Sequence, residues 1–171
     1  YGCIQINGDG FAYDFNCDSV QFSDCSFVSG NTCLGGSYPI QGIEVNSPTG
    51  GHISTTENYD FVVCCDPYQF VVGSSGYNFL SLSGDSSNSH VAEFNYGNGY
   101  TNYYISGSGL SSGCELVDYN ECVGTSEFCV FSVSGENNAH VADCVQEGYD
   151  YKLCCSWLES YLNKNLLDYY Y

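Results

Sequence analysis

The spacing of the cysteines constrains this chain more than any other feature. Twelve of the 171 residues are cysteine, in two groups of six separated by a long stretch without any. An even and dense set is typical of fully disulfide-bonded proteins, which persist in oxidising compartments. We therefore expect three bridges in each half of the chain and an extracellular or cell-surface location. The cysteines are Cys3, Cys17, Cys25, Cys33, Cys64, Cys65, Cys114, Cys122, Cys129, Cys144, Cys154 and Cys155.

Two pairs of adjacent cysteines, Cys64-Cys65 and Cys154-Cys155, lie in segments of strand-like composition. Neighbouring side chains in a strand point to opposite faces of the sheet. Each pair is therefore expected to bond to two different partners, with one sulfur facing the core and the other the outer surface. The spacing does not select the partners. The sequence contains no C-x-x-C pair, so a zinc knuckle is not expected.

Charge excludes several classes of partner. The chain has two basic and 20 acidic residues, which gives a formal net charge of -18. Such a chain cannot neutralise phosphates, so neither nucleic acid nor an anionic lipid surface is expected to bind it. No apolar run approaches the roughly 18 residues of a membrane-spanning helix. The chain begins at Tyr1 and has no methionine, from which we expect that a signal segment has been removed.

Many short segments rich in β-branched and aromatic residues alternate with Gly, Ser and Asn turns. This pattern predicts an all-β fold, specifically a disulfide-rich antiparallel β-sandwich or jelly-roll-like body. The expected strands are Cys3–Asn7, Phe11–Cys17, Ile40–Val45, Tyr59–Cys65, Tyr68–Val72, Asn78–Ser83, Ser89–Asn95, Thr101–Ile105, Phe128–Ser134, His140–Val145 and Tyr149–Cys155.

An internal repeat organises the body, which we expect to be one domain over residues 1–155. Three degenerate copies span about 25–66, 67–106 and 114–155, and each contains a small residue, a histidine and then Ile or Val. A unit this small must pack on its neighbours to bury its apolar face. The second copy has Tyr104-Ile105 where the others have paired cysteines, which suits a structural disulfide rather than a ligand or nucleophile.

The C-terminal residues 156–171 have a different pattern. A capping box begins at Ser156, and apolar residues then recur on one helical face. We expect a short amphipathic helix over 156–168 that docks on the body or on another copy. The expected subunit contacts are Ile4, Ile6, Trp157, Leu158, Tyr161, Leu162, Leu166 and Tyr169.

Candidate chemistry is sparse. The three histidines, His52, His90 and His140, occupy equivalent positions in the three copies, which we expect to lie apart in space. Each ring is then expected to bond a nearby turn carbonyl, with no metal and no cofactor. The acidic turn in 5–10 has some calcium-loop character but lacks the right first and last ligands, so a hairpin turn is expected there. No nucleophile elbow, dinucleotide fingerprint or P-loop occurs, and no enzyme activity is expected.

Four tyrosines cluster in the cysteine-free centre, at Tyr96, Tyr100, Tyr103 and Tyr104. Aromatic clusters of this kind pack within sheets, form subunit contacts or stack on sugars. All three roles stay open at this point. Ligand stacking would make the chain a carbohydrate-binding module.

The third copy resembles a known class of repeat. The stretch from Cys129 through Asn138-Ala139-His140-Val141 to Cys154-Cys155 is similar to cysteine-rich repeats of predicted secreted or surface proteins of archaea. The likeness covers about 35 residues well and the other copies in part. It implies a cell-surface location and carries no catalytic residues.

These observations favour a structural subunit of an extracellular, pilus-like filament. Copies would assemble head-to-tail, either through the N-terminal strand around Cys3-Ile4-Gln5-Ile6 or through the 157–171 tail. The net charge opposes association, so the contact must be apolar or bridged by counterions. The alternatives are a secreted module that binds surface glycans and a small secreted hydrolase.

Overall fold

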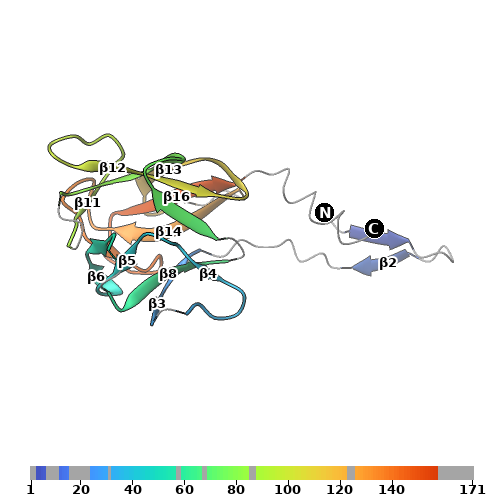
Figure 1. The fold of residues 1–171 in the computed structure, drawn as a ribbon. Coiled ribbons are helices and arrows are strands. Elements are labelled where there is room, and N and C mark those ends of the chain that lie inside the picture. The colour runs from blue at the N-terminus through green and yellow to red at the C-terminus, as the bar shows by residue number, and fades with distance from the viewer. Residues whose placement is uncertain are drawn as a thin grey trace.

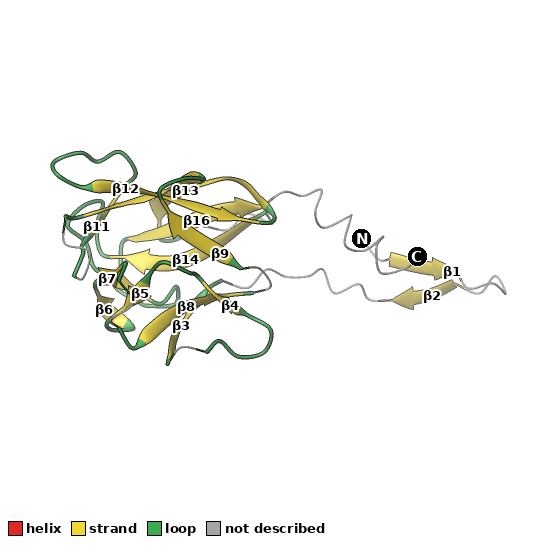
Figure 2. Ribbon diagram, in the orientation of Figure 1, coloured by secondary structure: helices red, strands yellow, loops and turns green. Residues whose placement is uncertain are grey.

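The computed structural model describes residues 3–6, 12–15, 24–30, 32–56, 59–66, 69–84, 88–122 and 126–157, and all the regular elements in these ranges are strands (Figure 2). None of these residues forms a helix that could cross a membrane. The strands are β1 (Cys3–Ile6), β2 (Ala12–Phe15), β3 (Ser26–Ser29), β4 (Tyr38–Pro39), β5 (Glu44–Val45), β6 (Thr49–Gly51), β7 (Ile53–Ser54), β8 (Phe61–Cys65), β9 (Phe70–Gly73), β10 (Tyr77–Leu82), β11 (Val91–Ala92), β12 (Thr101–Gly107), β13 (Leu110–Asp118), β14 (Glu127–Val133), β15 (Val141–Ala142) and β16 (Tyr151–Trp157).

Three antiparallel sheets with the same internal order make up the body (Figure 1). The first sheet has the order β3-β8-β5-β7, the second β9-β12-β10-β11, and the third β13-β16-β14-β15. Each sheet comes from one successive stretch of chain, so its second and last strands pair in the middle while its first and third strands lie outside. Strand β6 extends the third sheet beside β15, and β4 also pairs with β8. Strands β1 and β2 form a separate two-stranded sheet.

One apolar core is shared by all three sheets. Phe70 and Phe79 of the second sheet and Phe128 and Phe131 of the third are fully buried in it, and Val63 enters from the first. The rings of Phe70 and Phe128 stack with centroids 5.6 Å apart. No sheet buries its apolar face alone, because each face packs on side chains from the other two.

Five disulfides join ten of the cysteines, and the described residues contain no free thiol. The adjacent cysteines bond to different partners, as predicted, and every described bridge stays within its own half of the chain. One member of each pair, Cys65 or Cys155, belongs to the apolar core cluster, whereas Cys64 and Cys154 do not. The side chains of Cys3 and Cys17 lie outside the described residues. The bridges are Cys25–Cys65, Cys33–Cys64, Cys114–Cys155, Cys122–Cys154 and Cys129–Cys144.

The first and third sheets use the same two bridges. In each, the inner cysteine of the last strand bonds to the region of the first strand, across 40 residues for Cys25–Cys65 and 41 for Cys114–Cys155. The second sheet places Ile105 at the corresponding position of β12, where it is fully buried. An aliphatic side chain therefore fills the core volume that a disulfide fills in the other two sheets.

The structure also corrects the expected architecture. The all-β, antiparallel and disulfide-rich character is confirmed, but the body has three sheets around a shared core, whereas a sandwich has two. The predicted start of the C-terminal helix at Ser156 is wrong, because Ser156 and Trp157 continue strand β16. Trp157 is 3% exposed and packs on Phe128, with ring centroids 4.5 Å apart, so its side chain lies in the core of its own body. Residues 158–171 lie outside the described part of the chain.

Removing a core disulfide tests how this body is held together. The double variant Cys25→Ala and Cys65→Ala should lower the free energy of unfolding by about 4 kcal/mol, because a bridge that closes a loop of roughly 40 residues restricts the unfolded chain by that amount. Chemical denaturation followed by circular dichroism measures the change. A loss below about 1 kcal/mol would contradict the role assigned to the bridge.

Candidate functional site

Three short segments, residues 51–53, 89–91 and 139–141, meet where the three sheets come together. Each segment has a histidine at its centre and leads directly into an outer strand of a different sheet, which is β7, β11 or β15. Main-chain pairing joins each segment to the next, so the three close into a ring. The paired residues are Ile53 with Ser89, Val91 with Ala139, and Val141 with Gly51.

The small-His-apolar pattern follows from this ring. In every pair the apolar residue that follows one histidine stands opposite the small residue that precedes the next. Val91 and Ala139, for example, exchange two main-chain hydrogen bonds of 2.9 and 3.0 Å, and both side chains are buried. At Gly51 an added Cβ would come within 2.4 Å of Val45 and 2.5 Å of the Ser47 carbonyl, so a side chain cannot be accommodated. Paired residues point to one face, and the histidines between them therefore point to the other.

In each copy, one residue earlier in the chain forms hydrogen bonds with both the main-chain N–H and the main-chain carbonyl of the histidine. The Ser83 hydroxyl accepts from the His90 N–H at 2.9 Å, and the Ser83 N–H donates to the His90 carbonyl at 3.0 Å. Ser134 holds His140 in the same way, at 3.0 and 3.1 Å. In the first copy the side-chain oxygen of Asn46 accepts from the His52 N–H at 2.9 Å. The three rings are thus carried on fixed backbone.

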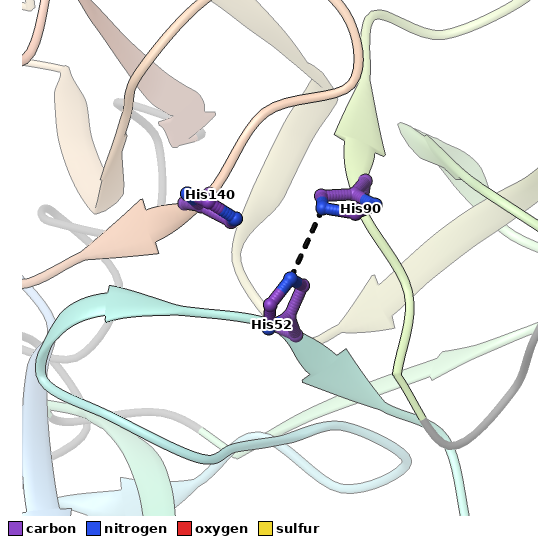
Figure 3. Close-up of side chains that lie close together, drawn as sticks. All are labelled: His52, His90 and His140. Carbon is purple, nitrogen blue, oxygen red and sulfur yellow. Dashed lines mark hydrogen bonds between the residues drawn. The ribbon is translucent and has the colours of Figure 1, made fainter.

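All three imidazole rings converge on one point (Figure 3). Their nearest ring nitrogens lie within 4.8 Å of one another, and Nε2 of His52 is 3.0 Å from Nε2 of His90. The ring centroid of His140 lies 4.6 Å from that of His52 and 5.2 Å from that of His90. All three side chains are half-buried, so the cluster is open to solvent. These rings offer three nitrogen ligands to one ion.

The cluster makes protonation of the His52 ring unfavourable. The pKa of His52 lies below its usual value of 6.5, first because partial burial removes water from the ring and then because His90 and His140 would place positive charges beside it. The cluster therefore favours the neutral form of His52, which has a nitrogen lone pair available.

The expectation that these histidines lie apart is wrong. That expectation assumed that equivalent positions in three copies are distant from one another. When the copies surround a central axis, however, equivalent positions next to that axis come together. The partner of the His52 ring is also the His90 ring rather than a turn carbonyl. The identical small-His-apolar context was the available signal, because the closed ring sets the same small and apolar neighbours beside each histidine.

The other candidate residues do not form one site. Tyr96 and Tyr100 meet edge to face at 5.1 Å, Tyr104 contacts Phe94 at 5.3 Å, and Tyr103 packs against the core. The four tyrosines are therefore divided among three environments, and all are half-buried. Ligand stacking by these rings stays a prediction. The remaining predicted contact residues lie outside the part of the chain that the structure describes. They are Leu158, Tyr161, Leu162, Leu166 and Tyr169, together with the side chains of Ile4 and Ile6 in β1.

Comparison with known proteins found no matching family model, no matching curated protein and no matching solved structure.

Acidification tests the electrostatics of the histidine cluster. Well above pH 6.5 His52 is neutral in both the folded and the unfolded chain, and its contribution to stability is fully present. As the pH falls from 6.5 to the lowered folded-state pKa, the unfolded chain takes up the proton first, so the free energy of unfolding decreases. Urea unfolding at about pH 7.5 and pH 5.5 should show a smaller decrease in the His52→Gln variant than in the unaltered protein. An equal decrease in both proteins would contradict this assignment.

Proposed function

We propose that this protein is an extracellular structural subunit that polymerises by adding the N-terminal strand of one copy to a sheet of the next. The observation that carries the proposal is an open groove along the edge strand β13, at one of the three places where neighbouring sheets meet. The ten bridged cysteines support the location, since such a set requires an oxidising environment.

The other two junctions between sheets are closed by main-chain hydrogen bonds. Between the third and first sheets, the Cys25 N–H donates to the Cys129 carbonyl at 2.8 Å, just before β3 begins. Between the first and second sheets, Gln41 lies against the outer edge of β9. Its N–H donates to the Phe70 carbonyl at 2.9 Å, and its carbonyl accepts from Val72 at 2.8 Å. The edge of β9 is therefore covered by Gln41, and the Phe27 N–H of β3 donates to the Asp143 carboxylate of the third copy at 3.0 Å.

The third junction, between β10 and β13, contains a groove of about 530 Å³. Strand β13 is nine residues long and lies at the edge of its sheet, where its ladder partner is β16. A long edge strand presents main-chain donors and acceptors to which another chain can pair, here except at Gly113, where an added Cβ would lie 2.6 Å from the Asn78 carbonyl of β10. The groove is lined by Asn78, Glu93, Phe94, Asn95, Ser112, Gly113, Cys114, Glu115, Leu116 and Ser156.

The N-terminal strand supplies a matching donor. Strand β1 pairs with β2 over four residues in a two-stranded sheet that no other described strand joins. A two-stranded sheet is marginally stable by itself, so addition of further strands would stabilise it. The segment Cys3–Ile6 carries no charge, and it therefore avoids repulsion in a groove that contains Glu93 and Glu115.

Strand addition of this kind produces a chain of subunits. The donor and the acceptor are different surfaces of the same protein, so the contact is head-to-tail and yields an open fibre unless its rotation closes a ring. Repulsion between copies that each carry a formal charge of -18 opposes this contact. Assembly should therefore be favoured by salt, which screens the charges.

One variant on each side of the proposed contact would test it. Ile4→Asp with Ile6→Asp charges the donor strand, and Ser112→Trp obstructs the groove at an exposed position. Both proteins should stay monomeric in size-exclusion chromatography and negative-stain images under conditions in which the unaltered protein forms fibres. Leu34→Asp is the control for added charge, because it places a negative charge on a side chain that is 77% exposed elsewhere.

Either of two results would refute the proposal. One is an unaltered protein that remains a monomer at every concentration and salt level tested. The other is fibres that form equally well in the donor variant, the groove variant and the Leu34→Asp control.

A further inference from the structure

We propose that His52, His90 and His140 form a three-nitrogen binding site for a divalent transition-metal ion of the zinc, nickel or copper type. The site lies on the axis where the three sheets meet, and it takes one ligand from each of them. It is independent of the proposed assembly, because the groove and the N-terminal strand contribute none of its ligands.

Ring geometry supports a single shared ion. Zinc–imidazole bonds measure about 2.0–2.1 Å, so two nitrogens on one tetrahedral ion lie about 3.3 Å apart. The His52 and His90 nitrogens are 3.0 Å apart, and the nearest nitrogens of all three residues fall within 4.8 Å. Small rotations of the side chains would therefore bring all three nitrogens to bonding distance of one ion.

The backbone makes the site preorganised. Each histidine lies between two residues that pair with the neighbouring segments, and its peptide N–H is held by Ser83, Ser134 or Asn46. Ion binding then has to order only the side-chain torsions of three rings on a fixed scaffold. Less conformational freedom is lost on binding, which favours affinity.

Charge favours a cation in this position. The neutral imidazole ring is the form that binds a metal. The net charge of -18 also raises the local concentration of cations around the protein.

Ligand type determines the class of ion. Neutral imidazole suits zinc, copper and nickel, whereas calcium and magnesium prefer oxygen ligands. Three protein nitrogens leave at least one coordination position for water, and the half-buried rings leave the site open to solvent. The ion would link the three sheets at a point that no described disulfide reaches, because each of the five bridges stays within one copy.

A hydrogen-bonded histidine pair is the competing explanation. One neutral ring donating to the other accounts for the 3.0 Å contact between His52 and His90, with His140 as a packing neighbour. The two explanations differ in the role of His140. Its removal leaves the hydrogen-bonded pair intact but takes away one metal ligand.

Calorimetric titration with Zn²⁺ separates these explanations. The full protein is first treated with a chelator and then titrated in excess Mg²⁺, which occupies surface carboxylates. We expect one Zn²⁺ per chain, and His140→Gln should bind at least about 100-fold more weakly, since even removal of groups that only orient a ligand costs 10–100-fold. Asn137→Gln, an exposed change in the same turn, is the matched control and should bind as the unaltered protein does.

Cu²⁺ provides an independent readout of the ligands. Electron paramagnetic resonance of the copper-loaded protein should show coupling to imidazole nitrogen, and each single substitution to Gln should alter it. The chain has only three histidines, so imidazole coupling can come from no other residue. Circular dichroism of each variant establishes that it is folded.

Two outcomes would overturn the proposal. The first is Zn²⁺ binding that excess Mg²⁺ abolishes, which would assign it to carboxylates. The second is Zn²⁺ affinity that is unchanged in folded His140→Gln protein.

Discussion

Main-chain pairing between the three histidine-bearing segments is the constraint on which the rest of this structure depends. Each segment pairs with the next, and the third returns to the first, so the ring fixes the three sheets relative to one another. Ring closure requires a small residue on one side of each histidine and an aliphatic residue on the other. It also directs all three histidines to the same face. The packing requirement and the candidate metal site thus have a single origin.

Disulfides and the ring act at different levels of the fold. The bridges join strands within one copy and stabilise the body by restricting the unfolded chain. The ring and the shared core join one copy to another. The second sheet illustrates this division, because it contains no bridge and is held by Ile105, Phe70 and Phe79 in the common core.

The sequence predicted the local chemistry of the fold better than its arrangement. Adjacent cysteines with different partners follow from strand geometry alone, and so does a β-rich chain with turns at Gly and Asn. Strand β13 was missed because its Ser-Ser-Gly start has the composition of a turn, and pairing with β16 overrides that local preference. The number of sheets depends on contacts between copies, which local composition does not encode.

The candidate site was the least predictable part. All three histidines were identified as equivalent, but equivalence alone does not show whether the copies form a row or surround an axis. In a row His52, His90 and His140 would be far apart, and around an axis they touch. Closure of the ring through Val141 and Gly51 decides between these arrangements, and that contact joins residues about 90 positions apart.

Nuclear magnetic resonance of the three imidazole rings tests this arrangement most directly. The chain contains no other histidine, so its spectrum has one Cε1–H signal each for His52, His90 and His140. The ring centroids lie 4.5 to 5.2 Å apart, and the account predicts through-space cross-peaks that connect all three rings. Three rings without cross-peaks to one another would contradict the closed ring and the convergence of the three sheets.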